Sequence, residues 1–187
     1  NILKLLISLG SAQLNNKDVE GDSILHYAAA SSSPGNVSCF KYLIDQGVLN
    51  VNAINNIGES VLMRCCRNAN HNCAQILINS GADVNCRMNN NNIESCCLDT
   101  TIMHQDQHTT LALIKAGADI HFTDSTGYTV LMQAVINKNE QAVMILLKHS
   151  GKSGKSGKSG KTLDLNIIHQ KTGMTCLHYA CLFGNAT

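Results

Sequence analysis

The chain has no tryptophan, a single proline and few aromatic residues, and these shortages restrict the kind of core it can build. Phe, Tyr and Trp make up only 4% of the 187 residues, although the hydrophobic fraction is 44%. The core must therefore come from Leu, Ile, Val, Ala and Cys, which suits thin layers of closely packed helices. The length fits one compact domain or one short repeat array.

The sequence also lacks an excess of charge and a long apolar run. The formal net charge is +1, so no global field attracts nucleic acid or an anionic membrane, and we expect no nucleic-acid partner. No apolar stretch approaches the roughly 18 residues of a membrane span, and no signal peptide is visible. We therefore expect no membrane span.

The nine cysteines are an odd number without C-x-x-C spacing, and two pairs are adjacent, Cys65-Cys66 and Cys96-Cys97. This pattern argues against a secreted disulfide framework and against a structural zinc site. The pattern instead favours a reducing compartment, and we expect a cytoplasmic location.

Five segments of the chain align with one another. They are "GDSILHYAA" (21–29), "GESVLMRCC" (58–66), "ESCCLDTTI" (94–102), "GYTVLMQAV" (127–135) and "GMTCLHYAC" (173–181). The fixed leucine falls at 25, 62, 98, 131 and 177, so the intervals are 37, 36, 33 and 46 residues. A basal period of 33 residues with insertions explains all four, which indicates a repeat architecture.

A second recurring segment lies between these, in which a run of mainly apolar residues is followed by a glycine. Examples are "ILINSGADVN" (76–85) and "ALIKAGADIH" (112–121). The two segments together predict a helix, a tight turn, a second helix, a glycine stop and a hairpin loop. Left-handed glycines that end the second helix and hydroxyl residues that begin the first fit this reading. They are Gly47, Gly81 and Gly117, and Ser23, Ser60 and Thr129.

The segments "DSILHYAA", "MTCLHYAC" and "SGADVN" resemble the ankyrin repeat, whose signature is T-P-L-H-x-A followed by a G-A-D-V-N exit. The resemblance covers nearly the whole chain and implies an all-α solenoid of stacked helix-turn-helix units with short hairpin loops. It also implies that His26 and His178 hydrogen-bond the hairpin turn of their repeat. The signature proline is absent throughout, and Glu94 replaces the expected glycine, so the third repeat departs most.

The repeats divide the chain into one array over residues 1–187. Partial repeats at 1–15 and 167–187 flank fuller ones at 16–52, 53–85, 86–121 and 122–166. A solenoid needs polar capping repeats, and neither end is one. We therefore expect a fragment of a larger intracellular protein.

The stretch "GKSGKSGKSGKT" (151–162) superficially suggests a phosphate-binding loop. A P-loop needs glycines five positions apart, but these glycines are separated by multiples of three. We interpret residues 150–162 as a flexible insertion after the second helix of a repeat, because lengthening a loop costs only about 0.6 kcal/mol per doubling. A basic tether for an acidic partner or a lipid headgroup is the alternative, and a nucleotide site is disfavoured.

Other chemical groups receive structural interpretations. Cys65, Cys66 and Cys181 fill small apolar positions, and no sequence feature supports a catalytic cysteine. His104 and His108 are spaced i, i+4, but a turn separates them, so no metal site is expected. Asn85 in "SGADVN" matches an asparagine that hydroxylases modify in ankyrin proteins, although a role in shaping the hairpin is the simpler interpretation.

Because stacking consumes the apolar face of each helix pair, a continuous concave surface is expected to remain exposed. We predict a non-catalytic interaction module, monomeric and without cofactor or metal, that binds another protein or an extended peptide there. Two rows on the first helices and the hairpin tips supply the candidate contacts. They are Tyr27, Arg64, Thr100, Gln133 and Tyr179; Arg67, Met103 and Ile136; and Ile57, Met88 and Tyr128.

Two other functions stay open. The array could be a targeting or autoinhibitory domain of a multidomain signalling enzyme, such as a kinase, a small-GTPase regulator or a palmitoyl-transferase, with its catalytic part outside this chain. Alternatively, the chain could itself be an enzyme that uses Cys66 or the GKS stretch. Thiol labelling at neutral pH or saturable nucleotide binding would support the second of these, and we expect neither.

Overall fold

A computed structural model describes residues 2–9, 13–31, 35–90, 93–151 and 162–183 of the chain. Within these residues the chain forms ten helices and one two-stranded sheet. The elements are α1 (Ile2–Ser8), α2 (Ile24–Ala30), α3 (Asn36–Asp45), α4 (Val61–Arg67), α5 (His71–Asn79), β1 (Arg87–Asn90), β2 (Ile93–Cys96), α6 (Cys97–Met103), α7 (Gln107–Lys115), α8 (Val130–Ile136), α9 (Glu140–His149) and α10 (Cys176–Leu182).

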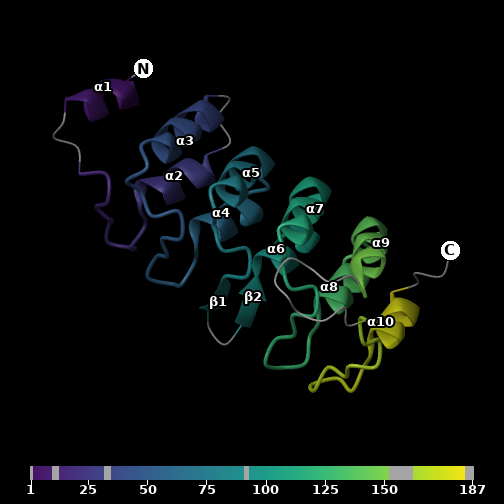
Figure 1. The fold of residues 1–187 in the computed structure, drawn as a ribbon. Coiled ribbons are helices and arrows are strands. Elements are labelled where there is room, and N and C mark those ends of the chain that lie inside the picture. The colour runs from purple at the N-terminus through teal and green to yellow at the C-terminus, as the bar shows by residue number, and fades with distance from the viewer. Residues whose placement is uncertain (1, 10–12, 32–34, 91–92, 152–161, 184–187) are drawn as a thin grey trace.

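The helices form two rows that run along the molecule (Figure 1). One row, called here the A helices, contains α2, α4, α6, α8 and α10, and each contacts the next. The other row, the B helices, contains α3, α5, α7 and α9, which also contact in sequence. Hairpin loops project from the same end of successive units, so the predicted solenoid of stacked helix pairs is confirmed.

Helix starts and stops follow the predicted chemistry. Ser60 Oγ and Thr129 Oγ1 accept hydrogen bonds from Met63 N and Met132 N at 3.1 Å, which satisfies free N–H groups at the start of α4 and α8. Glycines with positive φ end the B helices, at 69° for Gly47, 84° for Gly81 and 99° for Gly117.

The hairpin before α6 differs from the others, as expected from Glu94 in place of the usual glycine. Strands β1 and β2 pair in antiparallel register from Arg87–Cys96 to Asn90–Ile93. The other hairpins are closed by single bridges, such as Ile54–Ser60 and Thr123–Thr129. The helix still begins, because Cys96 Sγ replaces the hydroxyl cap and accepts from Asp99 N at 3.4 Å. The sequence departure therefore lengthens the loop and leaves the helix pair intact.

The turn from each A helix to its B helix repeats one construction. Asn70, Asp106 and Asn139 cap α5, α7 and α9 with a side-chain oxygen. The residue before each cap has a positive φ although it is not glycine: 50° at Ala69, 55° at Gln105 and 52° at Lys138. These three positions carry left-handed strain that the rest of the turn must offset.

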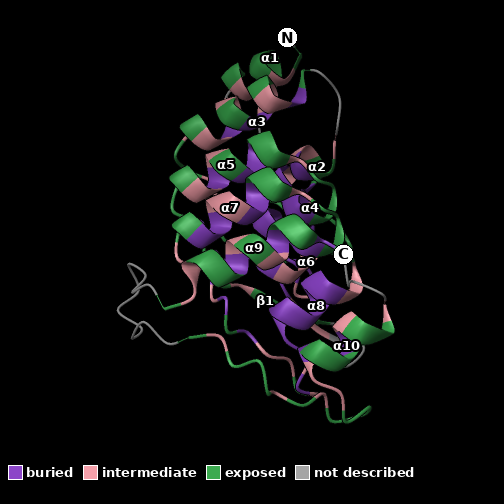
Figure 2. Cartoon of the chain, turned by 90° about the vertical axis from the view of Figure 1, so that its right-hand side faces the viewer, coloured by how far each residue is buried: buried purple, intermediate pink, exposed green. Residues whose placement is uncertain are grey.

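The core lies between the two rows, where the inward faces of the helices are buried (Figure 2). Leu25, Leu62, Leu98 and Leu131 are buried as predicted, each worth about 1.5–3 kcal/mol. Leu177 was expected to behave in the same way, but its side chain is 60% exposed because no described element packs over it.

The GKS insertion falls on residues 152–161, outside the described residues, so its flexibility stays a prediction. Its flanks agree with the sequence reading. Helix α9, the second helix of its pair, precedes the insertion. The residues on its two sides are joined by a hydrogen bond of 2.8 Å from Leu163 N to Ser150 Oγ.

Candidate protein-binding surface

The A helices place equivalent side chains side by side. Their contacts in the order α2, α4, α6, α8, α10 bring the second residue after each fixed leucine into one row and the fifth into another. Residues three apart on a helix share a face, so the two rows are neighbours. We call this surface the A-helix stripe. Its rows are Tyr27, Arg64, Thr100, Gln133 and Tyr179, and Ala30, Arg67, Met103, Ile136 and Leu182.

The second row is the more exposed and the more apolar. Met103 is 52% exposed, and Leu182, which sequence reasoning missed, is exposed as well. Ile136 is half-buried and Ala30 is exposed. Aligning the fifth position after each fixed leucine would have identified Ala30 and Leu182 as members of the row.

The first row mixes exposed and buried side chains. Tyr27 is 60% exposed, whereas Gln133 and Tyr179 are buried and present little surface to a partner. Thr100 is half-buried, and its hydroxyl donates to Cys96 O at 3.0 Å. Of this row, Tyr27 therefore offers the largest free surface.

Arg64 belongs to a charge cluster between the first two hairpins. Its Nη2 donates to Asp22 Oδ1 and Oδ2 at 3.0 and 2.9 Å, and its Nε donates to Glu59 Oε2 at 2.6 Å. Glu59 is fully buried, and its Oε1 is held by an ion pair with Arg67 Nη2 at 2.5 Å rather than by an aligned hydrogen bond. Asn55 Nδ2 donates to Asp22 Oδ1 at 2.8 Å. The guanidinium of Arg64 is consequently paired with carboxylates of the same chain, whereas Arg67 keeps 44% of its side chain exposed.

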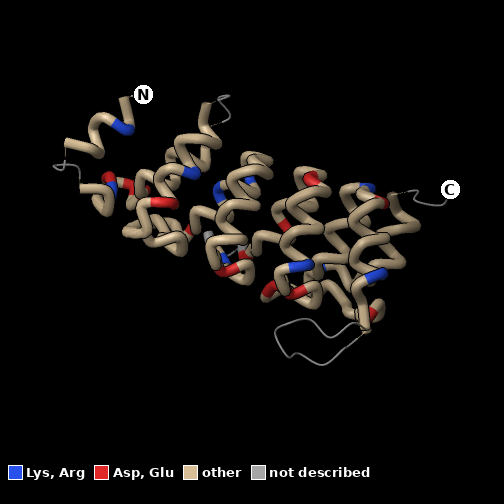
Figure 3. The backbone as a smooth tube through the Cα atoms, turned by 45° about the horizontal axis from the view of Figure 1, so that its top comes forward, with Lys and Arg blue, Asp and Glu red and all other residues tan. Residues whose placement is uncertain are grey.

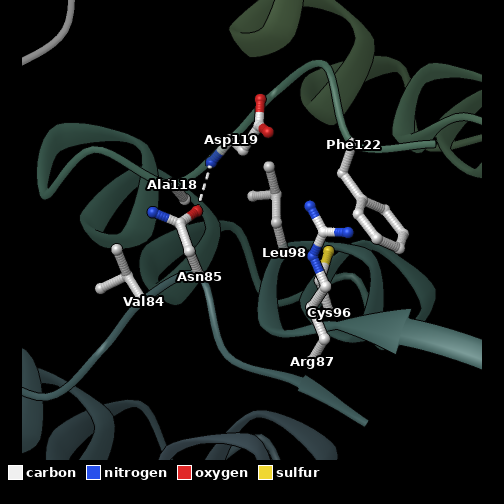
Figure 4. Close-up of a pocket in the computed structure, with 8 residues that line it drawn as sticks. All are labelled: Val84, Asn85, Arg87, Cys96, Leu98, Ala118, Asp119 and Phe122. Atoms are coloured by element: carbon white, nitrogen blue, oxygen red, sulfur yellow. Dashed lines mark hydrogen bonds between the residues drawn. The ribbon is translucent and has the colours of Figure 1, made fainter. Parts of the chain in front are cut away.

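The hairpins are joined to one another by side-chain amides. Asn85 Oδ1 accepts from Asp119 N at 2.8 Å (Figure 4). Asn52 Oδ1 accepts from Asp83 N at the same distance one unit earlier. The same figure shows Arg87 over the ring of Phe122, 4.9 Å from its centroid. The cavity between these side chains measures ≈ 10 Å³, which is too small for a ligand. Asn85 thus has a structural role between two units, and its hydroxylation stays an untested possibility.

The predicted hairpin contacts differ in environment. Ile57 is exposed at its hairpin tip, and Met88 on β1 is half-buried. Tyr128 is half-buried in an aromatic cluster, with its ring 5.4 Å from that of His169 and 6.4 Å from that of Tyr179. Burial raises the pKa of Tyr128, so its hydroxyl stays protonated and can donate a hydrogen bond.

His26 performs a structural task that extends what the resemblance implied. Its Nδ1 accepts from Ser23 N at 3.1 Å in its own hairpin, and its Nε2 lies 3.1 Å from Glu59 O in the next. Burial lowers the pKa of the ring, which favours the neutral form that this arrangement requires. His178 repeats only the first contact, with Thr175 N at 3.3 Å, and is exposed.

The other candidates for chemistry do not assemble into a site. Although the hydrogen bond with Cys97 favours the thiolate, burial raises the pKa of Cys66, which disfavours a nucleophile. His104 and His108 are separated by the turn, and the ring of His108 instead lies 5.9 Å from that of His71. In the described part of the chain no three His, Cys, Asp or Glu side chains are arranged to hold a metal ion.

Sequence reasoning missed a group of three thiols between α4 and the β1–β2 hairpin. Cys86 Sγ lies 3.3 Å from Cys97 Sγ, and Cys66 is in hydrogen-bond contact with Cys97. All nine cysteines lie among the described residues and are free thiols.

The hairpin segments carry a local excess of negative charge, although the chain as a whole is nearly neutral (Figure 3). Among their described residues nine are acidic and three are basic. The acidic ones are Asp18, Glu20, Asp22, Glu59, Asp83, Glu94, Asp119, Asp124 and Asp164, and the basic ones are Lys17, Arg87 and Lys171. Asp22 and Glu59 are paired inside the molecule with Arg64 and Arg67, and the other seven acidic residues still outnumber the three basic ones. The described hairpin residues therefore favour contact with positive charge.

Stacked helix pairs linked by hairpins, with an exposed stripe along one row, define a repeat solenoid. The family model described as ankyrin repeats (3 copies) matches residues 1–88 and 99–187, and the chain belongs to that family. No helix in the described ranges is long and apolar enough to cross a bilayer.

Three curated relatives are similar to parts of this chain. It is 26% identical over 138 residues to the E3 ubiquitin-protein ligase KEG of Arabidopsis thaliana, a match that covers 74% of this chain and 8% of the relative. The identity is 32% over 146 residues to an L-asparaginase of Dirofilaria immitis, covering 78% and 23%. It is 27% over 162 residues to the palmitoyltransferase AKR1 of Kluyveromyces lactis, covering 78% and 21%. The chain thus spans less than a quarter of each relative's length.

Proposed function

We propose that the chain is a non-catalytic protein-interaction module that binds another protein or an extended peptide along the A-helix stripe and the hairpin tips. The exposure of Met103 and Leu182 carries this proposal, because the A helices otherwise bury most of their large apolar side chains in the stack. Met, Tyr and Arg are enriched where proteins meet, and the stripe presents Tyr27, Arg67 and Met103 on three successive A helices.

The partner proposed here combines apolar side chains with positive charge. The second row of the stripe supplies apolar contact, and the acidic hairpins supply the complementary field. A long, shallow surface of this kind suits an extended segment better than a small molecule, because ligands of that size need an enclosing pocket.

A displayed peptide library selected against the folded chain tests the proposal. The dissociation constant of a selected peptide is then compared between wild type, Met103→Ala and Met144→Ala. Met144 is the matched control, since it is equally large and 68% exposed but lies on helix α9 of the other row. We expect Met103→Ala to weaken binding about tenfold, which is about 1.4 kcal/mol, and Met144→Ala to leave it unchanged.

If Met144→Ala weakens peptide binding and Met103→Ala leaves it unchanged, the binding surface lies on the B helices and the proposal is contradicted. The salt dependence of binding provides a second readout. If the acidic hairpins contribute, the dissociation constant should rise with ionic strength.

A second function is favoured by the lengths and names of the relatives, each of which is named as an enzyme much longer than this chain. The array would then target or inhibit a catalytic domain of the same protein, such as a palmitoyl-transferase, a kinase or a small-GTPase regulator. Adding this chain to the isolated catalytic domain should lower its activity, and Met103→Ala should restore it. Unchanged activity would leave only the interaction module.

A further inference from the structure

Two thiols meet at the base of the β1–β2 hairpin. Cys86 immediately precedes β1 and Cys97 immediately follows β2, and their sulfur atoms are 3.3 Å apart. The last pair of the strand register is Arg87 with Cys96, and Cys86 and Cys97 are the residues directly beyond it. The end of the ladder therefore brings the two thiols together.

The spacing expected for two residues facing each other across a hairpin fits a disulfide. Residues opposite one another in an antiparallel pair have Cα atoms about 4.5–5.5 Å apart. A disulfide bridges Cα atoms about 4.4–6.8 Å apart, with a sulfur–sulfur bond of about 2.05 Å. Moving the sulfurs from 3.3 Å to bonding distance thus requires a side-chain adjustment and no change in the fold.

Other hairpins of the array show that this position is a fixed part of the architecture. Val61 N donates to Ala53 O at 3.3 Å, and Val130 N donates to Phe122 O at 3.4 Å. Each of these pairs occupies the place that Cys86 and Cys97 occupy in their hairpin, directly outside the Ile54–Ser60 and Thr123–Thr129 bridges. The third hairpin carries a thiol at both members of the pair.

We propose that Cys86 and Cys97 are a site of oxidative modification, where hydrogen peroxide converts the two thiols into an intramolecular disulfide. The Cys86 sulfur attacks one peroxide oxygen, which breaks the O–O bond and gives a sulfenic acid and water. The Cys97 sulfur then attacks the Cys86 sulfur, and the S–S bond forms as the sulfenic hydroxyl leaves with the Cys97 proton as a second water. The two thiols lose two electrons to the peroxide.

Accessibility assigns the order of these steps. Cys86 is half-buried, so peroxide can reach its sulfur from solvent, whereas Cys97 is fully buried. Cys97 is therefore assigned the second step, the attack on the oxidised sulfur of Cys86. The hydrogen bond shared with Cys97, together with burial, raises the pKa of Cys86, so the reactive thiolate is scarce at neutral pH. Oxidation is consequently slow at pH 7 and accelerates as the pH rises.

The bond would close the base of the hairpin beside the neighbouring unit. Cys86 Sγ lies 3.0 Å from Ser60 Oγ, which caps helix α4 through Met63 N. The closed loop contains Met88, one of the proposed partner contacts. Oxidation therefore holds the base of a hairpin that belongs to the proposed binding surface, but the disulfide itself does not depend on that function.

Peptide mapping by mass spectrometry tests the proposal. The folded chain is oxidised with hydrogen peroxide at pH 8, unfolded in the presence of an alkylating agent so that buried free thiols are capped before they can exchange, and digested with trypsin, which cleaves after Arg64, Arg67, Arg87 and Lys115. Cys86 then falls in peptide 68–87, Cys97 in peptide 88–115 and Cys66 in peptide 65–67. We expect a link between peptides 68–87 and 88–115, with the loss of two hydrogens, as the main product of the folded chain, whereas a chain unfolded before oxidation should distribute its links over several cysteine pairs.

Matched variants identify the two sulfurs. Cys86→Ala copies Ala53 and Cys97→Val copies Val61, so both retain side chains that the fold accepts at these positions, and both should abolish the link. Cys73→Ala and Cys96→Ser share the same tryptic peptides and should preserve it. A link to peptide 65–67 would assign the bond to Cys65 or Cys66 instead. That result, or complete survival of both thiols in the wild-type chain, would overturn the proposal.

Discussion

Arg64 Nη2 lies 2.9 Å from Asp22 Oδ2, so a side chain on helix α4 is tied to the hairpin that precedes helix α2. The same guanidinium holds Glu59 through Nε, and only 16% of the Arg64 side chain is exposed. Removing one partner of a largely buried ion pair leaves uncompensated charge in place of a contact. The pair is therefore a structural connection between two units of the stack.

We predict that Arg64→Ala lowers the free energy of unfolding by about 3 kcal/mol, because Glu59 and Asp22 lose their shared counter-charge. Arg67→Ala should cost about 1 kcal/mol or less, since Arg67 is 44% exposed. Urea denaturation followed by circular dichroism measures both. Adding Glu59→Gln to Arg64→Ala should recover part of the loss, and a fully additive double variant would contradict the coupling.

Gly127 allows two hairpins to approach closely. Its φ is 81°, and a Cβ there would lie 2.5 Å from the Ile168 carbonyl oxygen. Gly58 has a similar φ of 77° but open space around it, so it isolates the cost of the left-handed conformation. We predict that Gly58→Ala costs about 1–2 kcal/mol and that Gly127→Ala costs at least about 1 kcal/mol more. Equal losses in thermal unfolding would show that the hairpins shift apart without penalty.

Much of the fold could be predicted because the repeat period fixes it. The fixed leucine, the capping hydroxyls and the stop glycines each recur, and a packed solenoid uses them in the same way in every unit. The burial of Leu177 was predicted wrongly for the same reason, since periodicity gives the position of a side chain but not whether a neighbour covers it.

The details of the surface were less accessible. The sequence placed Arg64 and Gln133 on the stripe, but only coordinates show that Arg64 pairs with two carboxylates and that Gln133 is buried. Cys65, Cys66 and Cys181 were predicted to fill small apolar positions, whereas the contact of Cys86 with Cys97 across a hairpin was not predicted. Aligning the hairpin bases would have paired these two positions.

Lys138 occupies a left-handed position in the turn between α8 and α9, with φ of 52°. Glycine adopts this conformation without the Cβ clash, although it adds freedom to the unfolded chain. We predict that Lys138→Gly raises the free energy of unfolding by about 0.5–1 kcal/mol. Lys148→Gly within α9 is the matched control and should lower it by about 1 kcal/mol. If both variants are destabilised in urea, left-handed strain at Lys138 is not significant.

Asp99 gives the array a pH-dependent stability. It replaces the signature histidine in α6, and burial, together with the nearby Asp124, raises the pKa of its carboxyl from 3.8 to about 7. Between these values the folded chain keeps a proton that the unfolded chain has lost. The contribution of Asp99 to the free energy of unfolding therefore falls as the pH rises from about 4 to 7.

Asn at this position is neutral at every pH and nearly the same size. We predict that Asp99→Asn stabilises the chain at pH 8 by up to about 4 kcal/mol, has little effect at pH 4, and flattens the profile between them. Urea unfolding at a series of pH values measures the difference from wild type, with the exposed Asp45→Asn as a control that should follow the wild-type profile. A stabilisation equally large at pH 4 and pH 8 would show that it arises from packing, because removing a buried charge can stabilise only where the wild-type carboxyl is ionised.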